Sequence, residues 1–126
     1  MARVRSKGSK IERRVRATFV CNRLSGFRCN IASILGKPDF AFEALRIAVF
    51  VDSCFWHGCP EHCRMPANAH VYWEKKIERN RRRDRAVSRG LRRAGWSVYR
   101  VRECRIDSAL PPLVRRISAR VAKRLQ

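Results

Sequence analysis

The chain has 126 residues, enough for one domain with a modest hydrophobic core. Its 30 lysines and arginines outnumber 10 aspartates and glutamates, and the formal net charge of +20 favours a polyanionic partner, nucleic acid first. Hydrophobic residues make up 45% of the sequence, which argues against a disordered chain, and no apolar run approaches the roughly 20 residues of a membrane span.

The first predicted element is a helix over the stretch SKIERRVRATFV. Ser9 is followed three residues later by Glu12, which is a capping-box pattern, and Ile11, Val15 and Phe19 recur every four residues. The capping role would explain Glu12 without any part in catalysis.

Three strands are predicted next. FRCNI (27–31) alternates apolar and polar residues, and the segment Gly36-Lys37-Pro38 then marks a turn before DFAF (39–42) and IAVFV (47–51). These patterns predict a hairpin that leads into a fully apolar, buried central strand.

A long basic helix is predicted from about residue 71 to 94. Apolar residues from Trp73 to Leu91 keep helical spacing within it, and Gly95 is a typical stop signal. The arginine run on this helix is most simply a surface that faces DNA phosphates, with contacts from Arg79, Arg82 and Arg83.

A last strand and a last helix complete the chain. WSVYRV (96–101) predicts the strand, and the spacing of apolar residues from Val114 to Leu125 predicts a helix that begins after the Pro111-Pro112 break. We therefore expect one mixed α/β domain over residues 1–126.

Sulfur and imidazole ligands gather after the central strand. Zinc prefers four such ligands in tetrahedral geometry, and free buried thiols with a surface histidine are the alternative. The five candidates for the four positions are Cys54, Cys59, His62, Cys63 and Cys104. A metal shared with Cys104 would join the loop after the central strand to the end of the last strand and so stabilise a small domain.

Two residues suggest hydrolysis of a phosphodiester. Asp39 follows a proline and opens a strand, as an acid does in nucleases of the PD-(D/E)xK type, although turn formation would also explain it. His57 lies among the candidate zinc ligands and titrates near neutrality, so it is either a general acid or base, a further zinc ligand or a loop hydrogen-bond donor.

Adjacent aromatic residues suggest contacts with bases. Phe55 and Trp56 would stack on bases or wedge between base steps if their loop is exposed, and otherwise at least one of them packs under the loop. Trp73, at the start of the basic helix, fits either group.

Taken together, five segments give a resemblance to a known family. RVRSKGSKIE, LGKPDFAF, VFVDSCFWHGCPEHC, YWEKKIERNRRRDR and LRRAGWSVYRVREC, in this order and within residues 1–106, resemble the very short patch repair (Vsr) DNA mismatch endonucleases. The resemblance implies a restriction-endonuclease-like fold, a mixed sheet flanked by helices, with a structural zinc. It also implies magnesium-dependent nicking of duplex DNA 5′ to the thymine of a T:G mismatch.

The resemblance assigns catalytic roles. Asp39 matches the magnesium-binding aspartate, Glu12 the acid that supports the metal-bound water and the active histidine, and His57 the histidine of general acid-base catalysis. A metal contact through the backbone carbonyl of Val51 is also implied. Asp52 departs from the family, which often has histidine there, and we interpret it as a second carboxylate near the metal.

The resemblance also assigns binding roles. The aromatics that intercalate beside the mismatch correspond to Phe55, Trp56 and Trp73. Two zinc ligands correspond to Cys54 and Cys104, and we select Cys59 and His62 to complete the set, with Cys63 as the alternative to His62.

The expected protein is a bacterial, cytoplasmic and nucleoid-associated endonuclease that acts as a monomer on mismatched double-stranded DNA, with mismatch-repair proteins as accessory partners. It would use catalytic magnesium and structural zinc. Two competing hypotheses are a non-catalytic, zinc-stapled DNA-binding module and a restriction-type nuclease on the same fold.

Overall fold

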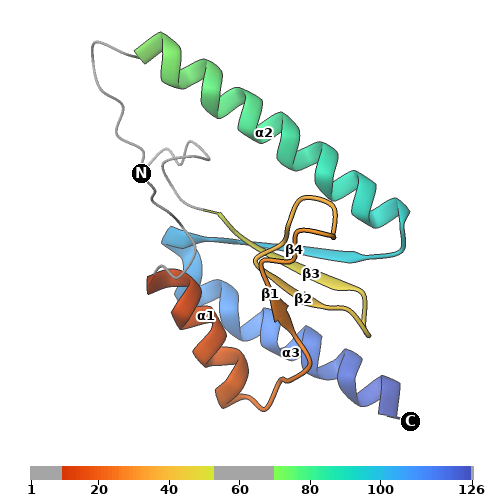
Figure 1. The fold of residues 1–126 in the computed structure, drawn as a ribbon. Coiled ribbons are helices and arrows are strands. Elements are labelled where there is room, and N and C mark those ends of the chain that lie inside the picture. Colours follow the sequence, from red (N-terminus) through yellow and green to blue (C-terminus); the bar gives the residue numbers. More distant parts are fainter. Residues whose placement is uncertain (1–9, 53–69, 126) are drawn as a thin grey trace.

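The structure, a computed structural model, describes residues 10–52 and 70–125, and Figure 1 shows a sheet with helices on both of its faces. The elements in chain order are α1 (Lys10–Cys21), β1 (Arg28–Cys29), β2 (Phe40–Phe42), β3 (Ile47–Asp52), α2 (His70–Arg93), β4 (Ser97–Arg102), the 3-10 helix η2 (Glu103–Arg105) and α3 (Ile106–Leu125). This mixed α/β architecture agrees with the predicted fold class and fits a restriction-endonuclease-like arrangement.

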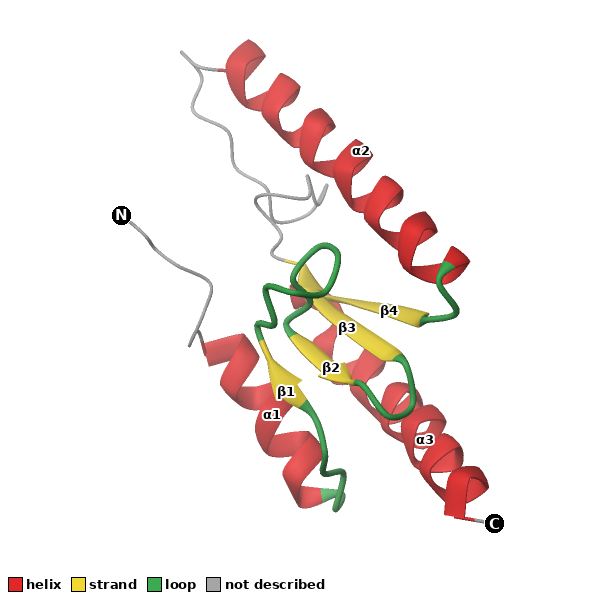
Figure 2. Cartoon of the chain, turned by 45° about the vertical axis from the view of Figure 1, so that its right-hand side comes forward, coloured by secondary structure: helices red, strands yellow, loops and turns green. Residues whose placement is uncertain are grey.

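The strands lie in the order β1-β2-β3-β4. β1 pairs antiparallel with β2 and β2 antiparallel with β3, whereas β3 and β4 run parallel from the pair Ile47 and Ser97 to the pair Asp52 and Arg102. A parallel pair needs a crossover connection rather than a tight turn, and α2 lies in that connection (Figure 2). The carboxyl ends of β3 and β4 therefore lie at the same end of the sheet.

The two faces of β3 belong to two hydrophobic clusters. Ile47 and Val49 pack with residues of α1 and α3, such as Phe19 and Ile117. Ala48 and Phe50 pack on the other face with residues of α2 and β4. Burial on both faces explains why the sequence of this strand is apolar throughout rather than alternating.

Two predicted boundaries are wrong. β1 is shorter than the predicted strand because only Arg28 and Cys29 pair with β2. α3 begins at Ile106 and contains Pro111 and Pro112, although a helix was expected only after them. Each internal proline costs about 3 kcal/mol. Four side chains that α3 buries around the prolines, each worth about 1.5–3 kcal/mol, offset this cost: Ile106, Leu110, Leu113 and Val114.

The long helix α2 is strongly basic. It spans 24 residues, and its last turn carries Arg92 and Arg93. Among the helices of residues 10–52 and 70–125, none combines the length and the apolar character that a membrane crossing requires. Figure 1 shows α2 on the face of the sheet opposite α1 and α3.

Candidate active site

The segment before β2 places Asp39 at the end of the sheet. Gly36 has a φ of 78°, and a Cβ at this position would lie 2.3 Å from Cγ1 of Val87 on α2. Glycine therefore allows this turn to approach α2 closely and at the same time to adopt a left-handed backbone. Pro38 is fully buried, so its packing holds in place the chain that leads into Asp39.

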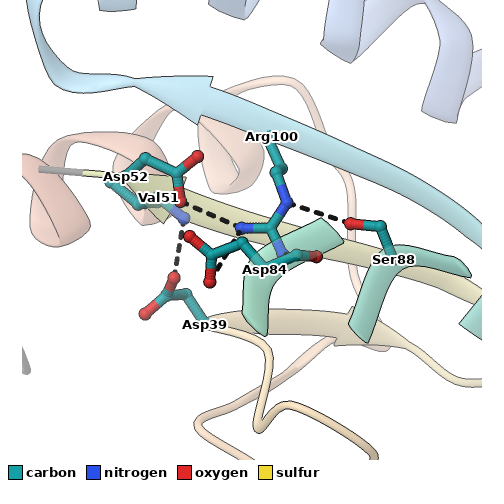
Figure 3. Close-up of polar contacts among 6 residues, drawn as sticks. All are labelled: Asp39, Val51, Asp52, Asp84, Ser88 and Arg100. Atoms are coloured by element: carbon teal, nitrogen blue, oxygen red, sulfur yellow. Dashed lines mark hydrogen bonds and ion pairs between the residues drawn. The ribbon is translucent and has the colours of Figure 1, made fainter. Parts of the chain in front are cut away.

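The carboxylate of Asp39 bridges β2 and β3. Its Oδ2 atom accepts a hydrogen bond of 2.6 Å from the backbone N–H of Val51 (Figure 3). In a β-strand the N–H and C=O of one residue point to the same side. The carbonyl of Val51 therefore points to the side on which Asp39 lies, as a shared metal contact would require.

The pKa of Asp39 is raised from 3.8 to about 6. Burial is the largest cause, and the negative charges of Glu12 and Asp52 add to it, whereas the Val51 N–H and the charge of Arg100 act in the opposite direction. Negative charge at Asp39 is therefore poorly compensated by the protein itself, and a cation beside it would relieve this cost.

Glu12 approaches the same place from α1. Its side chain belongs to the first turn of the helix and is buried, with only 6% of the residue exposed. Its charge raises the pKa of Asp39 and also, after burial, that of the Cys29 thiol. Ser9, the other half of the predicted capping box, lies outside the described residues.

Glu12 and Asp52 thus lie close enough to influence Asp39, but the three carboxylates do not form a complete metal cage. Within residues 10–52 and 70–125, no group of three or more His, Cys, Asp or Glu side chains is placed to hold a metal ion. Magnesium usually binds through one or two carboxylates and keeps several waters. Asp39 with the Val51 carbonyl is a donor set of this kind, so the residues present fit magnesium.

Asp52 is held by an arginine that the sequence analysis did not single out. Arg100 of β4 donates from Nη1 to Oδ1 of Asp52 at 3.1 Å, from Nε to the Ser88 hydroxyl at 3.1 Å, and from Nη2 to the backbone carbonyl of Asp84 at 3.1 Å (Figure 3). Its guanidinium also stacks on the ring of Phe50, 4.3 Å from the centroid. Asp52 is therefore oriented by an ion pair between β3 and β4.

The sequence contains a pattern that marks Arg100 as a charged residue in need of a partner. Val98 and Arg100 are two residues apart, so they face the same side of β4, and Val98 packs under α2. A charge on the buried face of a strand needs a partner. The partners themselves, Asp52, Asp84 and Ser88, belong to other elements and could not be identified from spacing alone.

The other predicted site residues are only partly described. Arg79, Arg82 and Arg83 are exposed on α2, and Arg82 lies 3.6 Å from Glu78. Cys104 is partly exposed in η2, directly after β4. Trp73 belongs to α2, but its side chain is outside the described part. The remaining predicted residues also lie outside it: Cys54, Phe55, Trp56, His57, Cys59, His62 and Cys63.

Comparison with known proteins identifies a matching family and several relatives. The family model described as DNA mismatch endonuclease Vsr matches residues 1–64. The type II nicking enzyme V.NaeI of Lentzea aerocolonigenes is 52% identical over 67 residues, which cover 53% of this chain and 40% of that enzyme.

Two other relatives match most of the chain. The type II nicking enzyme V.XorIIP of Xanthomonas oryzae pv. oryzae is 36% identical over 110 residues, 85% of this chain and 79% of that enzyme. The DNA mismatch endonuclease Vsr of Escherichia coli is 35% identical over 107 residues, 82% of this chain and 67% of that protein. The chain therefore belongs to the Vsr family of DNA mismatch endonucleases.

Proposed function

We propose that the protein is a DNA endonuclease that nicks one strand of a duplex, 5′ to the thymine of a T:G mismatch. The observation that carries the proposal is the half-buried carboxylate of Asp39, which accepts the Val51 N–H, lies at the end of the sheet near Glu12 and Asp52, and has a pKa raised to about 6. Relatives named as nicking enzymes and as a mismatch endonuclease support the reaction class.

Magnesium is the proposed catalytic ion. The Asp39 carboxylate and the Val51 carbonyl would hold it, and when bound it would polarise the scissile phosphate and generate a hydroxide-like water. Asp39 must be ionised for this role. Glu12 would orient the attacking water through its buried carboxylate, and His57 would move a proton, as the family resemblance implies.

Zinc is the proposed structural ion, with Cys54, Cys59, His62 and Cys104 as ligands. Asp52 pairs with Arg102 in the parallel sheet. Cys54 follows Asp52 by two residues, and Cys104 follows Arg102 by two residues. This matching position after two neighbouring strand ends supports the shared assignment of the two cysteines.

Nicking of labelled duplexes tests the proposal directly. Two duplexes of one sequence, with a T:G mismatch or fully paired, are incubated with the full chain in magnesium or in EDTA. We expect magnesium-dependent nicking of the thymine strand of the mismatched duplex alone. Equal nicking of both duplexes at one sequence would instead favour a restriction-type nuclease, and binding without nicking would favour the zinc-stapled binding module.

The variant Asp39→Asn provides the control for contaminating nucleases. The substitution keeps the size of the side chain and an oxygen that can accept the Val51 hydrogen bond. It removes the charge that binds the metal. We expect this variant to remain folded and to lose nicking, and full activity of the variant would contradict the assignment of Asp39.

A further inference from the structure

The arginines of α2 line two separate hollows. One hollow, the α2–β4 groove, has a volume of about 560 Å³ and lies between α2 and the strand β4. Its cationic lining comes from Arg81, Arg85, Arg89 and Arg92 of α2 together with Arg100 and Arg102 of β4. The other hollow, of about 580 Å³, includes Arg79 and Arg82. Sequence spacing alone does not separate these two sets of arginines.

The arginines of the α2–β4 groove form a row along the helix. Arg81, Arg85 and Arg89 are four residues apart and Arg92 follows after three, so all four lie on one face of α2. At a rise of 1.5 Å per residue the row is about 16 Å long. One DNA strand carries a phosphate about every 3.4 Å of helix axis, so the row is long enough to span several phosphates of one strand.

The acids of the α2–β4 groove do not cancel this charge. Asp52 and Asp84 also line the groove, but both are neighbours of Arg100, whose Nη1 lies 3.1 Å from Asp52 and 3.9 Å from Asp84. Six arginines against two aspartates leave a formal charge of +4 on the lining. Arg81, Arg85, Arg89, Arg92 and Arg102 are all exposed.

The second hollow is much less positive. Its charged lining consists of Lys75, Arg79 and Arg82 against Glu74 and Glu78, a formal charge of +1. Arg82 also lies 3.6 Å from Glu78, one helical turn earlier. Charge complementarity therefore favours the α2–β4 groove as the site for a polyanion.

The α2–β4 groove also adjoins the candidate active site. Asp52 lines the groove, and its charge acts on Asp39. Figure 3 shows Asp39, Asp52 and Arg100 close together beside Asp84 and Ser88 of α2. A phosphate backbone that follows the arginine row would therefore run toward the carboxylate that is proposed to bind magnesium.

We propose that the α2–β4 groove binds the phosphate backbone of duplex DNA, and that Arg81, Arg85, Arg89 and Arg92, rather than Arg79, Arg82 and Arg83, make the principal contacts from α2. The proposal rests on the proposed function, because the substrate is taken to be duplex DNA. It deepens that function by assigning the face of α2 that holds the substrate.

Duplex binding as a function of salt tests the proposal. Fluorescence anisotropy is measured in EDTA, so that no cleavage occurs, with a labelled paired duplex and full-length protein. Three double variants carry the same change in charge: Arg85→Gln with Arg89→Gln in the groove, Arg79→Gln with Arg82→Gln in the second hollow, and Arg93→Gln with Arg115→Gln at exposed positions outside both. Circular dichroism verifies that each variant is folded.

The groove pair should behave differently from the other two pairs. Each lost phosphate contact reduces the slope of log K against log salt by about 1, so the groove pair should lose about 2. Its Kd at physiological salt should rise by about two orders of magnitude, at about tenfold for each charged hydrogen bond. The Arg93 and Arg115 pair should change the Kd less than threefold.

Two results would overturn the groove assignment. One is an equal or larger loss in the Arg79 and Arg82 pair, and the other is the same loss in all three pairs. The proposed function fails separately: wild-type protein that shows the predicted ranking but never nicks DNA in magnesium would contradict the nuclease while supporting the groove.

Discussion

Asp39 is partly buried, which favours its protonated form, whereas its proposed role as a magnesium ligand requires the ionised form. The surroundings raise its pKa to about 6, chiefly by burial and then through the charges of Glu12 and Asp52. Without a cation, part of the Asp39 population is therefore protonated near neutral pH. Binding of magnesium would favour the ionised form, so ion binding and deprotonation at this site are coupled.

The raised pKa of Asp39 predicts a specific pH dependence of stability. Between about pH 4 and pH 6 the unfolded chain ionises Asp39 while the folded protein keeps the proton, so the free energy of unfolding falls as pH rises. The loss is about 3 kcal/mol and is complete above the folded pKa. Asp39→Asn removes it, so the variant should gain stability over the wild type across this window.

Urea denaturation in EDTA, at pH 4.5 and at pH 7.5, measures this difference. Subtracting the wild-type value from the variant value at each pH cancels the titration of the groups that do not interact with Asp39. A difference that stays the same at both pH values would contradict the raised pKa of Asp39.

The ion pair of Arg100 and Asp52 predicts energetic coupling. Both side chains are largely buried, 23% and 15% exposed. Removing one partner leaves the other charge poorly compensated, so Arg100→Gln and Asp52→Asn should each cost about 2–4 kcal/mol of stability. The double variant should cost less than the sum of the two by about 1–3 kcal/mol. Chemical denaturation of the four proteins gives the coupling.

Arg102 provides the matched control for Arg100. It lies two residues after Arg100 on β4, it is exposed, and it carries the same charge. Arg102→Gln should change the free energy of unfolding by less than about 0.5 kcal/mol. Strict additivity of the Arg100 and Asp52 substitutions would show that the ion pair does not position Asp52.

At the scale of elements, the turn that contains Gly36 fixes the distance between α2 and the start of β2. Gly36 and Gly26 both have positive φ, but a Cβ at Gly26 meets nothing within 4 Å, whereas one at Gly36 meets Val87. Gly26→Ala should therefore cost only the backbone strain of about 1–2 kcal/mol. Gly36→Ala should cost a further 1–3 kcal/mol, about the cost of overpacking, because α2 must move.

Thermal and urea unfolding of the two alanine variants would compare these costs. Nicking activity provides a second measurement, because displacement of the turn also displaces Asp39. Equal destabilisation by the two substitutions would mean that α2 does not restrict the turn.

The sequence predicted best the elements whose buried faces produce a regular spacing of apolar residues within the element itself. The four-residue spacing of Val15 and Phe19 predicted α1, and the apolar run from Ile47 predicted β3. The start of α3 was wrong because Pro111 is a strong local signal, whereas the contacts of Ile106 and Leu110 that override it are tertiary. Local propensity does not report such contacts.

In the candidate site, too, the sequence identified a residue that belongs to a local motif and missed one that depends on tertiary contacts. Asp39 was identifiable because its short motif places a carboxylate at a strand start, and the structure brings Glu12 and Asp52 near it. Arg100 was missed because its partners on α2 lie 12 and 16 residues earlier in the sequence. The parallel pairing of β3 and β4 that joins Arg100 to Asp52 is a property of the tertiary fold.

At the scale of the whole molecule, net charge acts against folding, and a structural metal would act in its favour. A formal charge of +20 on 126 residues disfavours the compact state through repulsion between like charges. The hydrophobic core around β3 opposes this repulsion, and a metal clip after the ends of β3 and β4 would add to its effect. Zinc is therefore expected to be needed for folding rather than for catalysis.

Elemental analysis of the purified protein should find one zinc per chain. Cys104→Ser should abolish zinc binding and unfold or strongly destabilise the domain, because the binding energy of a structural zinc is folding energy. Cys21→Ser is the matched control, since Cys21 is a free, exposed thiol and should change neither zinc content nor stability. Cys63→Ser should cost much less than Cys104→Ser if His62 is the fourth ligand, and the opposite ranking would make Cys63 a ligand. Absence of zinc from the wild-type protein, or a disulfide between Cys54 and Cys59, would contradict the zinc site altogether.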